Sequence, residues 1–334
     1  MAKRLAAKQE VVVFFTIVGL GLVIGLVNPA FFTAGNLFNL INSSVVMGIF
    51  ALGVLVVLLS GGIDVSFTAI AVFAFYSTVK FLGTHNFQGS LLVPFGMATL
   101  IGLSLGLVNG FFVSRLKLMT LIATLGTASV FRGFLLTFIG STIYTKLPSS
   151  MVAFSRAYLV EVVQGRARYG LHAGILVLAA CALLTWFLLN RTMLGRGIHA
   201  LGGDRVAAER AGFRIERLQY FIYAFSGAIA GIAGIVHSSM ARIAMPSDLL
   251  GHELNVIAAV VLGGARITGG KGTVTGALLG TFLVTMITQS LILLGIPSYW
   301  QQAVLGALIL VGTALPALQA KRKEAVGGAL GGVS

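Results

Sequence analysis

Charged residues are scarce in this chain of 334 residues. Only 10% of them are Asp, Glu, Lys or Arg, whereas an average soluble domain has about 25%. Hydrophobic residues make up 57% of the chain, which is more apolar surface than a soluble fold can bury beneath a polar exterior. The composition therefore excludes a soluble enzyme, a secreted disulfide-rich domain and a disordered protein. It predicts an all-α integral membrane protein.

Cysteine is almost absent, and no chemical site can be assembled from the other residues. Because Cys181 is the single cysteine, neither an internal disulfide nor a cysteine-based zinc site can form. The five histidines show no metal-ligand spacing, and no Ser/His/Asp set is evident. We therefore expect no metal, no catalytic residue and no enzymatic activity in this chain.

Acidic residues are few, so the formal net charge is +14. In a soluble chain this excess would suggest nucleic-acid binding. Membrane proteins instead concentrate Lys and Arg in their cytoplasmic loops, and we expect that explanation here, with a lipid bilayer as the surroundings and no nucleic-acid partner.

A nucleotide-binding loop is also missing. The segment 269–273 has the sequence Gly-Gly-Lys-Gly-Thr, but a phosphate-binding loop needs Ser or Thr directly after the lysine, and Gly272 follows Lys271. We expect no cofactor in this chain, so ATP and magnesium would be bound by a partner subunit.

Ten apolar runs are long enough, or nearly so, to cross about 30 Å of hydrocarbon. They are residues 11–27, 44–60, 66–82, 91–113, 119–139, 171–190, 218–238, 254–264, 274–294 and 300–318. Most Lys and Arg residues fall on the side of the N-terminus, which predicts a multi-pass protein of the bacterial inner membrane with both termini in the cytoplasm. Five spans in each half, about 1–170 and 171–334, would give two inverted halves within one transmembrane domain.

Two of these runs are short and end at glycine pairs. The run 44–59 stops at Ser60-Gly61-Gly62, and the run 254–262 stops at Gly263-Gly264. Irregular backbone at membrane depth persists only where it is buried in protein or lines a water-filled cavity. The pattern predicts two discontinuous spans beside the path of a transported solute.

Asp64 follows the first glycine pair and is, apart from Glu10, the only acidic residue among the first 160. It is placed to cap a helix that starts near Val65. Two alternatives stay open, a role in gating the solute path and a role in proton coupling.

Several side-chain amides lie in or beside the apolar runs. Asn36, Asn39 and Asn42 share one helix face, Asn109 lies in the fourth run and Gln289 in the ninth. Amides in hydrocarbon either bridge helices or line water. Because an uncharged amide both donates and accepts hydrogen bonds, such a lining would suit a hydroxyl-bearing solute.

Glycines recur every fourth residue at Gly102, Gly106 and Gly110, and again at Gly227 and Gly231. Such ladders let helices approach closely. They indicate either packing within the chain or an interface between subunits.

The segment 191–217 is the longest cytoplasmic stretch between predicted spans. Asp204 can cap a short helix over 205–211, and Gly212 can end it. Arg205 and Glu209 are spaced to pair across one turn. Since so short a helix has little core of its own, it either docks on another protein or belongs to a solvated basic loop. The small residues that would face a partner are Ala207, Ala208 and Ala211.

At these positions the sequence resembles the membrane subunits of ribose-type ABC importers, the second carbohydrate-uptake class, which includes permeases for ribose, other sugars, inositol and autoinducer-2. The landmarks are Leu59-Ser60-Gly61-Gly62-Ile63-Asp64-Val65-Ser66, Gly106-Leu107-Val108-Asn109-Gly110, Thr124-Leu125-Gly126-Thr127 with Phe131-Arg132-Gly133, Gly195-Arg196 with Ala200-Leu201-Gly202-Gly203, and Glu253-Leu254 followed by the run 257–264.

The resemblance implies a fold like that of the vitamin B12 importer permease, with about ten helices. It implies a second permease subunit, identical or paralogous, together with cytoplasmic ATP-binding subunits and a periplasmic substrate-binding protein. It also implies that the segment 196–212, preceded by Gly195, contains the helix that couples to the ATPase. Phe67-Thr68 and Asn255 depart from the family pattern, and Phe67 tilts the resemblance weakly toward autoinducer-2 permeases.

Together these inferences predict an ATP-driven importer subunit that carries a sugar or sugar-like solute. The alternative is an ion-coupled secondary transporter of a small polar solute. The expected pathway residues are Ser60, Asp64, Ser66, Asn109, Gln289 and Asn39. The expected coupling residues are Gly195, Arg196, Asp204, Arg205, Ala207, Ala208, Glu209, Ala211 and Gly212. The expected docking residues for the binding protein are Arg156, Arg166, Arg242 and Glu253.

Overall fold

The computed structural model describes residues 2–164, 167–297, 300, 303–304 and 306–307. Within these residues, eight helices are long and apolar enough to cross a membrane. They are α1 (Ala2–Val27), α2 (Ala34–Leu59), α3 (Phe67–Thr84), α4 (Leu92–Ser114), α5 (Thr120–Phe134) with its π-helical extension η2 (Leu135–Ile139), α7 (Gly174–Arg191), α10 (Ile215–Ala241) and α12 (Val274–Leu293). This confirms an all-α integral membrane protein.

The predicted end of the second span at Ser60 is confirmed, but its predicted shortness is wrong. Helix α2 runs unbroken over 26 residues, about 39 Å at 1.5 Å per residue, and Thr33 caps its start. The helix begins before the apolar run, and two of the amides in its first turns are bonded within the fold. Asn36 donates to the carbonyl of Phe31, and Asn42 donates to the carbonyl of Gly170.

The other interrupted span is confirmed as short. Helix α11 (Glu253–Leu262) has only 10 residues and ends at Gly263. The predicted tenth span, 300–318, falls largely outside the described residues.

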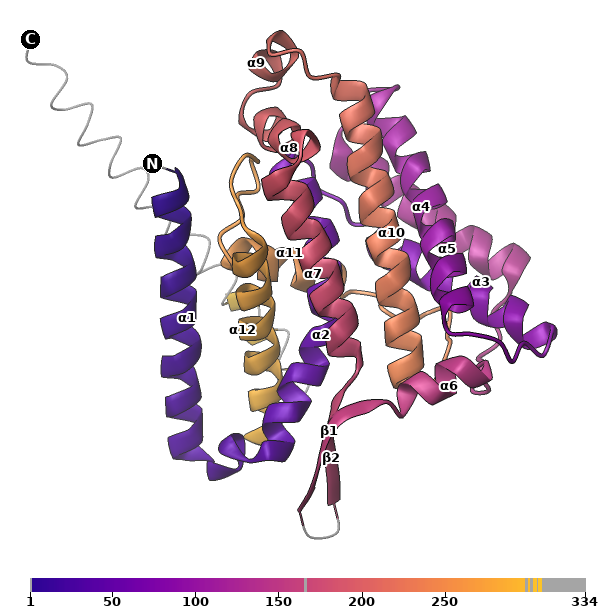
Figure 1. Ribbon diagram of the computed structural model, residues 1–334, viewed down its shortest axis with the longest axis vertical. Helices are drawn as coiled ribbons and strands as arrows, with labels where there is room; N and C mark the ends of the chain where they lie inside the picture. The colour runs from indigo at the N-terminus through magenta and orange to yellow at the C-terminus, as the bar shows by residue number, and fades with distance from the viewer. Residues whose placement is uncertain (1, 165–166, 298–299, 301–302, 305, 308–334) are drawn as a thin grey trace, which may run out of the picture.

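The two ends of the helix bundle differ in kind (Figure 1). One end carries the N-terminus together with α8 (Met193–Gly203) and α9 (Arg205–Arg210), and we call it the α9 end. The opposite end carries the short helix α6 (Ser149–Ser155) and an antiparallel hairpin of β1 (Tyr158–Gln164) and β2 (Ala167–His172), and we call it the hairpin end. The hairpin and α6 lie where the sequence predicted only a loop.

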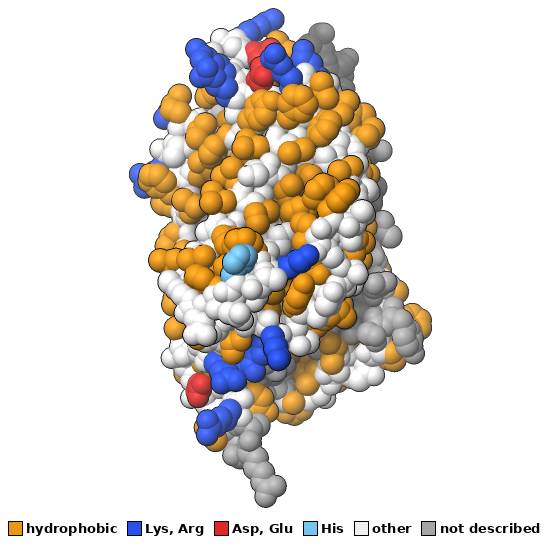
Figure 2. Space-filling view, turned by 90° about the vertical axis from the view of Figure 1, so that its right-hand side faces the viewer, with side chains coloured by type: hydrophobic (Ala, Val, Ile, Leu, Met, Phe, Trp, Pro, Cys, Tyr) orange, Lys and Arg blue, Asp and Glu red, His pale blue; other side chains and the backbone are white. Residues whose placement is uncertain are grey.

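Basic side chains gather toward both ends on the face shown in Figure 2, whereas hydrophobic side chains cover most of the middle. This distribution is the one that a lipid-facing belt between two aqueous surfaces requires.

Helices α4 and α10 pack along each other through glycine. A Cβ atom added at Gly102 would lie 2.2 Å from the carbonyl oxygen of Gly227, and one at Gly106 would lie 2.2 Å from that of Tyr223. The ladders therefore bring two helix backbones of the same chain into contact, as the packing interpretation predicted.

Helices α2 and α10 cross the bundle in opposite directions. The start of α2 contacts the hairpin through Asn42, whereas α10 begins at the α9 end and finishes beside α6. Helix α4 packs on α10, and correspondingly α12 packs on α2. The arrangement is compatible with two inverted halves, which stay a prediction.

Candidate functional site

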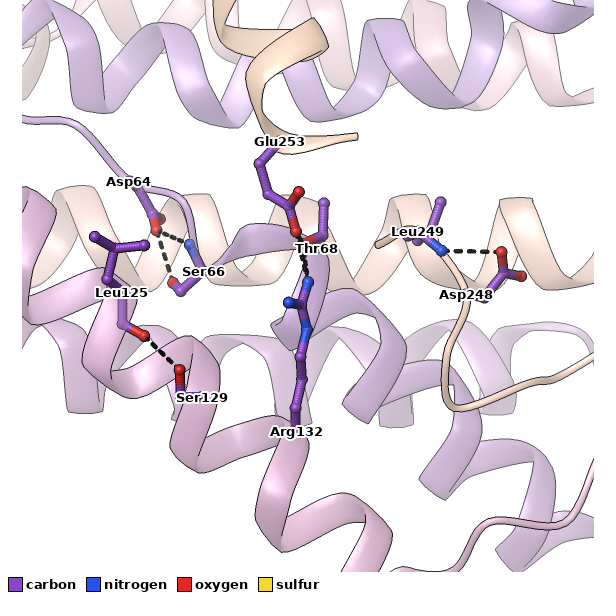
Figure 3. Close-up of polar contacts among 9 residues, drawn as sticks. All are labelled: Asp64, Ser66, Thr68, Leu125, Ser129, Arg132, Asp248, Leu249 and Glu253. Atoms are coloured by element: carbon purple, nitrogen blue, oxygen red, sulfur yellow. Dashed lines mark hydrogen bonds and ion pairs between the residues drawn. The ribbon is translucent and has the colours of Figure 1, made fainter. Parts of the chain in front are cut away.

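A polar network is enclosed where α3, α4, α5 and α10 meet. Asp64 accepts hydrogen bonds from the backbone N–H and the hydroxyl of Ser66, both at 2.7 Å (Figure 3). The Asn109 amide donates to the Ser66 hydroxyl at 2.7 Å and accepts from Thr127 at 2.6 Å. Ser226 of α10 reaches the other Asp64 oxygen at 3.4 Å. All five side chains are buried, so the network satisfies polar groups that hydrocarbon would leave unpaired.

Two further hydroxyls of α5 bind the backbone of the segment between α2 and α3. The backbone N–H of Ile63 donates to the Thr120 hydroxyl at 3.0 Å, and that of Val65 donates to the Thr124 hydroxyl at 3.3 Å. Helix α3 begins at Phe67, two residues after the predicted start near Val65, and Ser66 occupies the cap position that was predicted for Asp64. Asp64 instead closes a local turn onto Ser66.

An ion pair lies next to this segment. Arg132 of α5 contacts Glu253, the first residue of α11, with 2.5 Å between Nη2 and Oε1, and Thr68 of α3 donates to the same carboxylate oxygen (Figure 3). The expectation that Glu253 is an outward docking charge is wrong, since its side chain is only 14% exposed and is held by both partners. Arg132 lies inside the predicted span 119–139, but its partner could not be identified from spacing.

A cleft of about 860 Å³ opens at the hairpin end between α2, α10, α11 and α12. Its wall carries amides, hydroxyls and two histidines, but among its described lining residues no Asp, Glu, Lys or Arg. Gln289 lines it and donates to the Ser43 hydroxyl at 2.9 Å. The polar members of the wall are Asn42, Ser43, His237, His252, Asn255, Thr285, Thr288 and Gln289.

A smaller cleft of about 300 Å³ opens at the α9 end. Ser60, Gly61 and Gly62 form one side of it, and the Arg205 side chain reaches it from α9.

The structure thus separates the predicted pathway residues into four groups. Gln289 lines the hairpin-end cleft and Ser60 lines the α9-end cleft. Asp64, Ser66 and Asn109 belong to the enclosed network. Asn39 is exposed on α2 and lines neither cleft.

The predicted short helix at the α9 end is present. Asp204 accepts from the N–H groups of Val206 and Ala207 at 2.8 and 3.1 Å, and Gly212 leaves the helix with a φ of +87°. Arg205 and Glu209 pair at 3.4 Å.

The three alanines of this helix do not share one exposed face. Ala208 is buried, whereas Ala207 and Ala211 are exposed. Gly195 and Arg196 lie in the first turn of α8, where the Thr192 hydroxyl caps the helix.

Two of the predicted docking residues are exposed at the hairpin end. Arg156 follows α6, and Arg242 ends α10 in a left-handed conformation while donating to the Ser155 hydroxyl at 2.9 Å. Arg166 lies outside the described residues.

Comparison with known proteins identifies relatives over most of the chain. The ribose import permease protein RbsC of Escherichia coli (strain K12) is 31% identical over 86% of this chain and 88% of its own length. RbsC of Bacillus subtilis (strain 168) is 31% identical over 88% of each chain. The autoinducer 2 import system permease protein LsrC of Klebsiella pneumoniae is 33% identical over 92% of this chain and 86% of its own length. No solved structure matches the chain significantly.

A family model matches residues 36–312, which include both clefts, the enclosed network and the segment of α8 and α9. This match spans far more than half of the chain, and the relatives share its permease designation. The chain therefore belongs to the family described as branched-chain amino acid transport system / permease component.

Proposed function

We propose that this chain is the membrane-spanning subunit of an ATP-driven importer for a sugar or sugar-like solute. The observation that carries the proposal is the hairpin-end cleft. Its amides and hydroxyls offer donors and acceptors to a hydroxylated solute, while no fixed charge from Asp, Glu, Lys or Arg lies among its described lining residues. The names of the relatives point to ribose and autoinducer-2 as the first solutes to test.

In this proposal the chain lies in the bacterial inner membrane with both termini in the cytoplasm, so that α9 faces the cytoplasm. A cytoplasmic ATP-binding subunit, which holds ATP and magnesium, acts on α9 through its exposed residues Ala207 and Ala211. A periplasmic binding protein docks on the hairpin end, where Arg156 and Arg242 are exposed. A second permease subunit, identical or paralogous, completes the pathway.

The enclosed network weighs against an ion-coupled transporter. The Asp64 carboxylate is buried and is bonded to Ser66 and Ser226, and Asp64 lines neither cleft. A carboxylate that carries protons across a membrane needs access to both sides in turn. These hydrogen bonds support a structural role for Asp64 in the segment between α2 and α3.

The test is uptake by proteoliposomes that contain the chain, its ATP-binding subunit and its binding protein. We expect uptake of labelled D-ribose or autoinducer-2 only when all three proteins and ATP are present. Uphill uptake by the chain alone, driven by a proton or sodium gradient, would support the ion-coupled alternative and reject this proposal.

A further inference from the structure

The α9-end cleft contains two buried polar atoms without partners. Tyr223 is 2% exposed, and the Thr120 hydroxyl lies beside its hydroxyl but already accepts from the Ile63 N–H at 3.0 Å, so within the described part of the chain no well-formed hydrogen bond satisfies Tyr223. The side-chain oxygen of Gln219, one turn earlier on α10, is also buried and without a partner among the described residues. An unsatisfied buried polar group costs about 1–3 kcal/mol, which a bound ligand or water can relieve. Six other such atoms occur among the described residues, but only Tyr223 and Gln219 line this cleft.

Both residues line the same cleft. Its volume of about 300 Å³ is at the lower end of the range of small-molecule sites. Helices α5, α8, α9 and α10 contribute to its wall, together with the segments that follow α2 and α11. The polar residues of the wall are Ser60, Thr120, Arg205, Gln219, Tyr223 and Thr268.

Glycine keeps the space beside the tyrosine open. A Cβ atom added at Gly62 would lie 3.1 Å from the Tyr223 hydroxyl oxygen and 3.3 Å from the Thr120 methyl carbon. At Gly61, φ is +82°, a conformation that strains other residues. The chain therefore passes the cleft as bare backbone where a ligand would approach Tyr223.

The two unpartnered atoms specify the chemistry of the ligand. The Gln219 oxygen only accepts, so its partner must supply a donor, whereas the Tyr223 hydroxyl can both donate and accept. A fully ionised phosphate cannot supply the donor that Gln219 requires. A hydroxylated molecule supplies donors and acceptors on neighbouring atoms.

Arg205 connects this cleft to the coupling helix. It is the first residue of α9, and Gly202 of α8 lines the cleft beside it. A displacement of α9 would therefore alter the wall of the cleft directly.

We infer that the α9-end cleft is a binding site for the hydroxylated solute on its way out of the permease, with Tyr223 and Gln219 as its hydrogen-bonding residues. The inference rests on the proposed function and deepens it. Because Arg205 belongs both to α9 and to the wall of the cleft, solute binding at this site depends on the position of α9.

The test uses cysteine protection in the full chain, assembled with its ATP-binding subunit in nanodiscs without nucleotide. Cys181→Ser removes the single native cysteine, and Thr268→Cys then places one thiol on the wall of the cleft. The matched control is Leu116→Cys, which is exposed in the loop between α4 and α5 and does not line the cleft. A small charged methanethiosulfonate reagent reports the accessibility of each thiol.

We expect saturating D-ribose or autoinducer-2 to slow modification at position 268 at least fivefold and to leave position 116 unchanged. Tyr223→Phe and Gln219→Leu, each made in the Thr268→Cys background, should raise the half-protecting concentration about three- to tenfold, the effect of one hydrogen bond. Two variants are used so that the misfolding of one leaves the other informative.

The outcomes separate this inference from the proposed function. Normal ATP-dependent uptake without protection by either solute would overturn the inference alone, and water would then satisfy Tyr223 and Gln219. Protection that both substitutions leave unchanged would also overturn it. Saturable protection that both substitutions weaken, without any ATP-dependent uptake, would support the site and reject the importer.

Discussion

Arg132 and Glu253 form an ion pair at 2.5 Å although 121 residues separate them in the chain. Arg132 belongs to the first half of the sequence and Glu253 to the second, and Thr68 at the start of α3 donates to the same carboxylate. The first turns of α3 and α11 are thereby held together. This contact fastens one predicted half to the other close to the segment that joins α2 to α3.

Removing one partner of this pair should destabilise the protein. Glu253→Gln leaves the largely buried Arg132 charge without a counter-charge, and we expect a loss on the order of 3 kcal/mol in the free energy of unfolding in detergent micelles. The matched control is Glu216→Gln, which breaks the exposed pair of Arg115 and Glu216 and should cost at most about 1 kcal/mol. Equal losses would show that the Arg132–Glu253 pair has no special structural role.

Asn109 and Gln289 should respond differently to the same substitution. Asn109→Leu leaves the Ser66 oxygen without its donor and reduces the Thr127 hydroxyl to its longer bond with the Thr124 carbonyl, so it should lower the free energy of unfolding by about 1–3 kcal/mol. Gln289→Leu changes a partly exposed wall of the hairpin-end cleft and should reduce solute uptake while leaving thermal stability nearly unchanged. A stable Asn109→Leu protein would contradict the structural role of the network.

The contact between α4 and α10 can be tested with one alanine. Gly102→Ala places a methyl group where the Gly227 carbonyl already lies, and we expect destabilisation of about 1–3 kcal/mol. Gly96→Ala on the same helix is the control, because no atom lies within 4 Å of its added Cβ. Thermal melts of both variants in the same detergent make the comparison. Because alanine favours a helix more than glycine does, Gly96→Ala should be neutral or slightly stabilising, and an equal loss of stability in both variants would contradict the packing explanation.

The loop between α10 and α11 should be sensitive to acid. Burial raises the pKa of Asp248. The hydrogen bond and charge of His237, the Leu249 N–H and the charge of His252 lower it by more, so the pKa lies below its ordinary value of 3.8. The stability that ionised Asp248 contributes is therefore complete above the unfolded-state pKa of about 4 and is lost as pH falls through the folded-state pKa. The difference in Tm between the wild type and Asp248→Asn should therefore shrink as the pH falls below about 4. A difference that persists unchanged at pH 3 would contradict this assignment.

Features set by neighbouring residues could be predicted from the sequence. Asp204 and Gly212 delimit α9 because a cap and a left-handed turn involve residues only a few positions apart. The membrane-spanning helices followed from composition, since hydrocarbon imposes both their length and their apolarity. The start of α2 was misjudged because the partner of Asn42 lies in β2, more than 100 residues away.

Contacts between distant segments could not be predicted. The polar residues Asp64, Ser66 and Asn109 were identified one by one, but their shared network needs α3, α4 and α10 in place. Likewise, no spacing rule pairs Arg132 with Glu253 or brings Tyr223 beside Gly62. The hairpin of β1 and β2 was not predicted, because it lies almost entirely between the predicted spans 119–139 and 171–190.

The central claim is that a separate ATPase drives transport through α9. Ala207 is exposed on this helix whereas Ala208 is buried, so Ala207→Glu changes the proposed docking surface without burying a charge. The control is Ser90→Glu in the exposed loop between α3 and α4. The decisive measurement is the rate of ATP-dependent uptake in proteoliposomes at matched amounts of folded protein. We predict at least a tenfold loss for Ala207→Glu and no change for Ser90→Glu, and an unchanged rate for Ala207→Glu would contradict the account.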